Sequence, residues 1–121
     1  MIEHKSFIAQ ATVGAFLILK PGTADNTVVP AASATDLLIG TSDSLDKATG
    51  EMVDMDVRPV PEVKLGAAVT RGALLTSNAS GQAVTAAPAA GANVNVIGRA
   101  LKSGAAGDVI PYVRGIGTVQ G

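Results

Sequence analysis

The chain has 121 residues, one histidine and no cysteine, which excludes a thiol nucleophile, a disulfide and a cysteine-ligated zinc site. It has no tryptophan, one tyrosine and two phenylalanines, and because aromatic side chains dominate most cores, this scarcity favours a chain that completes its core by assembly. The formal net charge is −1, but residues 1–63 carry nine acids against four bases, whereas residues 64–121 carry five bases against one acid. This asymmetry indicates either complementary faces between subunits or solvated loops that happen to differ.

Short apolar runs alternate with Gly- and Pro-rich turns at a spacing of about 8–12 residues, which predicts an all-β fold. We expect a small β-barrel or sandwich-like domain with at most a short helix. Residues 1–6 are expected to form a flexible N-terminal arm, and residues 7–121 a single β-rich domain. In chain order, the predicted strands are 7–11, 15–20, 27–30, 37–41, 51–63, 73–76, 82–86, 93–102 and 108–115.

The connections between these strands are also predictable in part. Residues 31–36 are small and polar enough for one helical turn, and residues 42–50 form a loop rich in Asp and Ser. The segment 51–63 alternates with a period of two, as in a half-buried strand. Because Pro59 and Pro61 cannot donate to a ladder, this strand is expected to lie at an edge or to leave the sheet there.

The sequence offers little for catalysis. His4 is the single histidine, and nothing in the sequence proposes a nucleophile or an orienting acid beside it. No nucleophile elbow, phosphate-binding loop or zinc-protease motif occurs. The motif Asn78-Ala79-Ser80 matches a glycosylation sequon, but a hairpin turn is its better interpretation. We therefore expect no enzyme activity and no cofactor.

Other binding classes are also disfavoured. The basic residues are dispersed and aromatic side chains are few, so nucleic-acid binding is not expected. The apolar stretch 7–19 is interrupted by polar residues and is too short to span a bilayer, so no membrane association is expected. A calcium site and a solvated acidic loop remain alternative interpretations of one acidic cluster, whose members are Asp43, Asp46, Glu51, Asp54 and Asp56.

Two C-terminal segments carry a resemblance to a known family. They are VKLGAAVTRGALLTSNASGQAVTAA (63–87) and NVIGRALKSGAAGDVIPYVRGIG (95–117). Both resemble the small capsid decoration, or cement, proteins of tailed bacteriophages, in which Gly-led turns are followed by short apolar strands. The pattern is carried here by Gly66, Gly72, Gly98, Ala100, Leu101, Gly107 and Asp108.

This resemblance implies a non-enzymatic structural protein that folds in the host cytoplasm and binds the outer surface of an assembled phage capsid. Its expected partners are the major capsid protein and further copies of itself, with a trimer favoured and a dimer possible. The N-terminal arm and the acidic loop are the predicted partner contacts, through Ile2, Glu3, His4, Lys5, Asp43, Asp46 and Glu51.

Two alternatives stay open at this point. One is a head-fibre base or carbohydrate-binding β module on a virion surface, although sugar sites usually stack aromatic faces and this chain has only Phe7, Phe16 and Tyr112. The other is an enzyme or a lipoyl- or biotin-carrier domain. A carrier lysine would lie at a hairpin tip, and residues 77–81 contain none.

Overall fold

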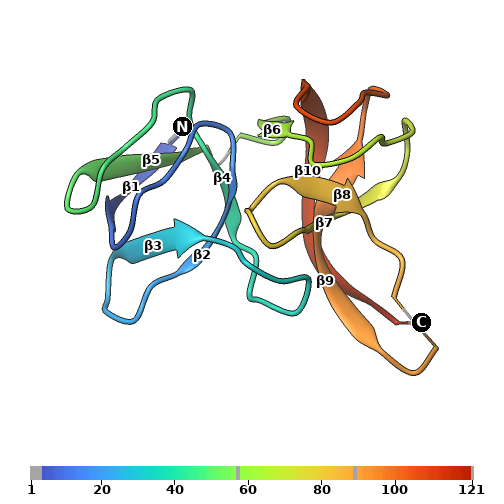
Figure 1. Ribbon diagram of the computed structural model, residues 1–121, viewed down its shortest axis with the longest axis horizontal. Helices are drawn as coiled ribbons and strands as arrows, with labels where there is room; N and C mark the ends of the chain where they lie inside the picture. Colours follow the sequence, from blue (N-terminus) through green and yellow to red (C-terminus); the bar gives the residue numbers. More distant parts are fainter. Residues whose placement is uncertain (1–3, 57, 89, 121) are drawn as a thin grey trace.

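The computed structural model describes residues 4–56, 58–88 and 90–120 and shows two β-sheets side by side, one from each half of the chain (Figure 1). The first is a closed barrel with the strand order β1-β3-β2-β4-β5, and the second is a five-stranded sheet with the order β6-β10-β9-β7-β8. No helix occurs in these ranges, so the prediction of an all-β fold is confirmed. Across the same part of the chain, no helix has the length and apolar character needed to cross a membrane.

We call the two parts the N-terminal barrel and the C-terminal sheet. The N-terminal barrel contains β1 (His4–Ala9), β2 (Ile18–Pro21), β3 (Thr27–Pro30), β4 (Gly40–Ser42) and β5 (Met52–Asp56). The C-terminal sheet contains β6 (Glu62–Lys64), β7 (Leu74–Ser77), β8 (Ala83–Thr85), β9 (Asn93–Ala100) and β10 (Val109–Gln120).

The two halves have the same topology. In the barrel, β2 lies between β3 and β4, and β5 pairs with both β4 and β1. In the sheet, β7 lies between β8 and β9, and β10 pairs with both β9 and β6. The parallel pairing of β1 with β3 has its counterpart in a single parallel bridge between Leu65 and Ala83. The chain is therefore an internal structural repeat in which β6–β10 correspond to β1–β5.

The turns repeat as well. The glycine that precedes β5, Gly50, has a φ of 88°, and Gly107, which precedes β10, has a φ of 90°. Each glycine is followed by an acid that caps the same turn, since Glu51 Oε1 accepts from the Ala48 amide at 2.6 Å and the Asp108 carboxylate accepts from the Ala105 amide at 2.9 Å. Agreement in the pairing register and in these caps defines which residues of the two halves correspond.

The two halves differ at the junction between their first and third strands. In the barrel, β1 and β3 meet directly, and the Ile8 amide donates to the Asn26 carbonyl at 2.7 Å. In the C-terminal sheet, the segment 16–18 of the barrel lies between the equivalent strands. The Lys64 amide donates to the Phe16 carbonyl at 2.8 Å, and the Ile18 amide donates to the Gly81 carbonyl at 2.7 Å. The backbone of the barrel thus fills the gap between β6 and β8 that the C-terminal sheet leaves open.

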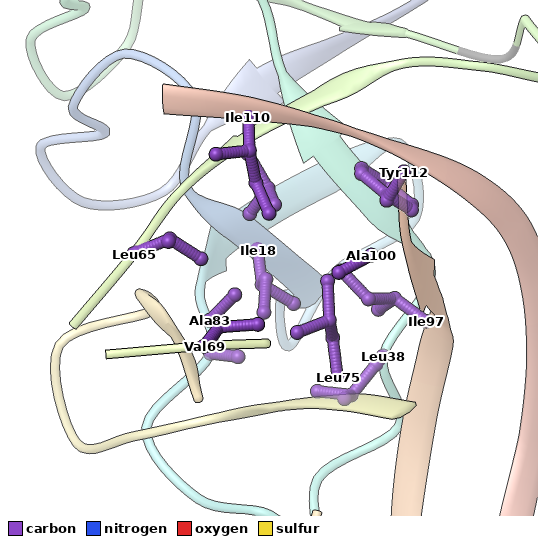
Figure 2. Close-up of a cluster of buried hydrophobic side chains, with 12 residues drawn as sticks. Ile18, Leu38, Leu65, Val69, Leu75, Ala83, Ile97, Ala100, Ile110 and Tyr112 are labelled. Atoms are coloured by element: carbon purple, nitrogen blue, oxygen red, sulfur yellow. The ribbon is translucent and has the colours of Figure 1, made fainter. Parts of the chain in front are cut away.

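This insertion joins the two halves through one large core. Ile18 is fully buried and lies in the middle of the C-terminal cluster, close to side chains from β7 and β8 (Figure 2). The cluster also takes Ala31 and Leu38 from the N-terminal half. The barrel keeps a smaller core of its own, made of Ala9, Val13, Leu19, Val28, Val53 and Met55. Burial of aliphatic surface at about 25 cal/mol per Å² is the main favourable term here.

Several strand predictions are confirmed, including the hairpin of β7 and β8. Its turn forms because Asn78 Oδ1 accepts from the amides of Ser80 and Gln82 at 2.9 and 3.0 Å. The prediction of one strand over 51–63 is wrong, since β5 ends at Asp56 and β6 begins at Glu62. Between them the Pro59 and Pro61 carbonyls accept from amides of β10, so the prolines lie in a link that flanks the sheet.

Three other segments differ from expectation. Residues 31–36 form no helical turn, because Asp36 accepts from the Ala32 amide and Asn95 donates to the carbonyls of Ala34 and Asp36. In the predicted arm, residues 4–6 belong to β1 and pair with β5, while residues 1–3 lie outside the described residues. The last strand does not end at residue 115 but continues to Gln120 past an irregularity between Arg114 and Gly117.

Candidate binding surface

A hollow lies on the outer face of the C-terminal sheet. Leu74, Arg99 and Val113 lie side by side there, because Leu74 pairs with Arg99 and Arg99 with Val113. The hollow has a volume of about 470 Å³. Its lining residues are Arg71, Gly72, Leu74, Gly98, Arg99, Ala100, Leu101, Val113 and Gly115. We call this hollow the groove.

The groove depends on a close approach of two strands. A Cβ added at Gly98 would lie 1.9 Å from the Val113 carbonyl oxygen, so only glycine fits this position of β9. Arg99 extends toward the 71–74 segment, where its Nη1 donates to the Gly72 carbonyl at 2.9 Å. The sequence therefore shapes the groove with a glycine in its floor and a guanidinium fixed at its margin.

The floor of the groove is apolar and partly open to solvent. Leu101 and Val113 are 43% and 44% exposed, and Leu74 is half-buried. Arg71 and Arg99 are exposed and supply positive charge beside this apolar surface. The groove residues include no carboxylate, imidazole or hydroxyl, so the arrangement suits binding and offers no acid–base or nucleophilic chemistry.

The same face of the N-terminal barrel is buried. The residues that correspond to Leu74, Arg99 and Val113 are Ile18, Thr41 and Asp56, with exposures of 0%, 0% and 5%. Ile18 belongs to the C-terminal core cluster, Thr41 contacts Tyr112, and Asp56 is paired with Arg58.

One buried hydrogen bond marks this contact between the halves. Thr41 Oγ1 lies 3.0 Å from the Tyr112 hydroxyl, and the bond is buried between the N-terminal barrel and the C-terminal sheet. Burial raises the pKa of Tyr112 to about 12. An ion pair of Asp56 with Arg58 lies at the edge of the same face.

The predicted partner contacts come from the start of the chain and from the loop before β5. His4 and Lys5 lie in β1, and Ile2 and Glu3 fall outside the described residues. Asp43, Asp46 and Glu51 lie in the acidic loop, where each carboxylate accepts a backbone amide. The donors are Leu45, Ala15 and Ala48, at 3.1, 2.8 and 2.6 Å. Their role in binding a partner stays a prediction, but their role in fixing the loop is now visible.

The acidic cluster does not assemble into a metal site in the part of the chain that the structure describes, where no group of three or more potential ligands is found. The carboxylates serve different turns and strands, for example Asp54, which accepts from the Ser6 hydroxyl at 2.8 Å. The solvated-loop interpretation therefore fits these residues better than the calcium interpretation.

Sequence reasoning did not single out the groove residues Arg71, Leu74 and Val113. The pattern that points to them is the internal repeat, which is visible in VGAFLIL (13–19) beside VTRGALL (69–75). Aligning these segments pairs Ile18 with Leu74 and Ala15 with Arg71.

The fold and the groove describe an all-β protein of two fused five-stranded units, one of which carries an open groove. Residues 10–115 match the phage cement protein family, so the chain belongs to that family and is a structural protein of a phage virion. No curated protein matches the chain. Among solved structures, it is similar to the head fiber gp8.5 N base of bacteriophage phi29, with a TM-score of 0.71 and 21% identity over 95% of each chain. That likeness shows the fold alone.

Proposed function

We propose that this protein binds the outer surface of an assembled phage head and cements neighbouring capsomers. The observation that carries the proposal is the family match over residues 10–115. The major capsid protein is its partner, and the protein acts there as a homo-oligomer, with a trimer favoured.

The physical character of the chain supports this role. Its two halves share a core, so the protein is a stiff body and not two units on a tether. Its groove combines exposed aliphatic surface with positive charge and carries no reactive group. A protein repeated at many symmetric sites gains strength by multivalency, so modest individual contacts hold the shell together.

The proposed shell contact is the N-terminal end of the chain. Residues 4–6 pair with β5 and are needed for the barrel, so residues 1–3 are the part that deletion can remove without breaking β1. An extended segment gains main-chain hydrogen bonds when it adds to a partner's sheet edge.

Cosedimentation with undecorated, expanded heads tests the proposal. The intact protein should saturate the heads at a fixed ratio to the capsid subunit and should raise the temperature at which the heads release their DNA. The variant that lacks residues 1–3 should stay folded and bind at least tenfold more weakly. Failure of the intact protein to bind would contradict the proposed function, and full binding by the variant would contradict only the contact.

A second candidate is the base of a head fibre, which the similarity to the phi29 head fiber base favours. Stoichiometry separates the two. A cementing protein occupies every equivalent junction of the shell, whereas a fibre base is expected at a subset of them. Counting bound copies per capsid subunit at saturation decides between these functions.

A further inference from the structure

The groove lies on a face whose counterpart already serves as a protein interface within this chain. Ile18 and Thr41 of the N-terminal barrel are fully buried against the C-terminal half. The corresponding Leu74 is half-buried and Arg99 is exposed, and the two lie side by side on β7 and β9 of the C-terminal sheet (Figure 1). The molecule therefore carries one occupied and one open copy of the same face, and the open copy lies in the C-terminal half.

The chemistry of the groove restricts what it binds. Its floor is aliphatic, with Leu101 and Val113 both more than two-fifths exposed, and Arg71 and Arg99 stand beside it. A matching partner presents an apolar side chain with carboxylates next to it, so that the apolar tip is buried and the guanidiniums are paired.

The acidic loop of this chain, residues 42–50, has that composition. Leu45 is 55% exposed although it is aliphatic, and it stands between Asp43 and Asp46 in the sequence. Each of the two carboxylates accepts one backbone amide and keeps further acceptor positions. Within the described residues, neither carboxylate forms a salt bridge.

We infer that the groove of one copy binds the acidic loop of a second copy, with Leu45 in the groove and Asp43 and Asp46 facing Arg71 and Arg99. The contact is head-to-tail, from the N-terminal barrel of one copy to the C-terminal sheet of the next. Such heterologous contacts close into rings when the rotation permits. The inference deepens the self-association part of the proposed function and accounts for the opposite charges of the two halves.

Because the chain has no cysteine, single-cysteine variants give an unambiguous test. Leu45→Cys and Leu101→Cys are mixed, one of them carrying an affinity tag, and oxidised both in solution and when bound to undecorated heads. The matched control replaces Leu45→Cys by Leu37→Cys, since Leu37 is also an exposed leucine of the N-terminal half, at 63%. Adding Arg71→Glu to the Leu101→Cys variant tests the charge pairing. Adding Asp43→Lys to the Leu45→Cys variant tests whether the reversed pair restores it.

The expected result is a disulfide-linked heterodimer of Leu45→Cys with Leu101→Cys at a yield at least tenfold above the Leu37→Cys control. Arg71→Glu should lower this yield, and Asp43→Lys should restore it in part. Equal yields for both pairs would overturn the inference, as would no heterodimer on fully decorated heads. Cross-linking of Leu101→Cys to the shell subunit would show that the capsid occupies the groove and would also overturn it. If the protein fails to bind heads, the proposed function fails, while the result in solution still decides this inference.

Discussion

The N-terminal barrel and the C-terminal sheet are two versions of one architecture placed in different surroundings. Their strands pair in the same order and register, yet Thr41 is fully buried whereas its counterpart Arg99 is exposed. The residue types follow this environment: the covered face carries Ile18 and Thr41, and the open face carries arginine and partly exposed aliphatic side chains. In this chain the strand framework is repeated, and one copy of the face is buried within the molecule while the other stays open.

The largest effect is expected at Gly98, where the close approach of β9 and β10 shapes the groove. Gly98→Ala places a methyl group 1.9 Å from a backbone oxygen, so the strands must separate. We expect the free energy of unfolding to fall by at least about 4 kcal/mol. Urea denaturation measures this loss. Gly115→Ala is the matched control, because an added Cβ there meets nothing within 4 Å. Similar stabilities for the two variants would refute this role of Gly98.

The next largest loss of stability is expected at Ile18, and it is compared with the loss at the corresponding residue Leu74. Ile18→Ala leaves a cavity in the shared core and should cost about 2–5 kcal/mol. Leu74→Ala removes the corresponding side chain from the open face and should cost less than about 1 kcal/mol. Denaturation of the two variants under the same conditions gives the difference. Equal losses in the free energy of unfolding would mean that the two faces lie in the same environment.

Alkaline pH tests the burial of Tyr112 between the halves. Burial raises the pKa of Tyr112 from its ordinary value of 10.0 to about 12. Because the pKa is higher in the folded protein, the stabilising contribution is complete below about pH 10 and is lost as the pH rises toward about 12, on the order of 2–3 kcal/mol.

The readout is direct, since Tyr112 is the single tyrosine and the chain has no tryptophan. Ultraviolet absorbance of the tyrosinate should follow unfolding, and Tyr112→Phe should lose stability less steeply between these pH values. Titration of the folded protein with a midpoint near pH 10 would contradict the buried placement of Tyr112.

The smallest loss of stability is expected from removing a side chain that accepts a backbone amide at equivalent turns of the two halves. Asp46 Oδ1 accepts from the Ala15 amide at 2.8 Å, and the corresponding Arg71 amide donates to the Ser103 hydroxyl at 2.9 Å. Asp46→Ala and Ser103→Ala should each lower the free energy of unfolding by about 1 kcal/mol. Asp46→Ser should recover most of the loss if the two caps are equivalent. Thermal unfolding of the three variants measures this.

The sequence predicted the fold class and the hairpin of β7 and β8 well, because both depend on local turn chemistry such as the Asn78 cap. The predictions from sequence failed where contacts with a neighbouring segment determine the structure. The predicted end of the last strand at residue 115 is wrong, because β9 is long enough to pair beyond it and extends β10.

The candidate site was predicted less well than the fold. Burial of Thr41 cannot be inferred from its strand, since it depends on the contact with Tyr112 of the other half. The repeat leaves only a short trace in the sequence, because the shared positions hold small residues such as Gly50 and Gly107 while the faces differ in chemistry.

Amide hydrogen exchange tests the central claim most directly, by following the segments 16–18 and 71–75 in the free and the assembled protein. The Ile18 amide, which donates to Gly81, should be protected in both states. The segment 71–75 should exchange faster in the free protein and become protected on decorated heads. No change in that segment on assembly would contradict the claim that the uncovered face is the one used for binding.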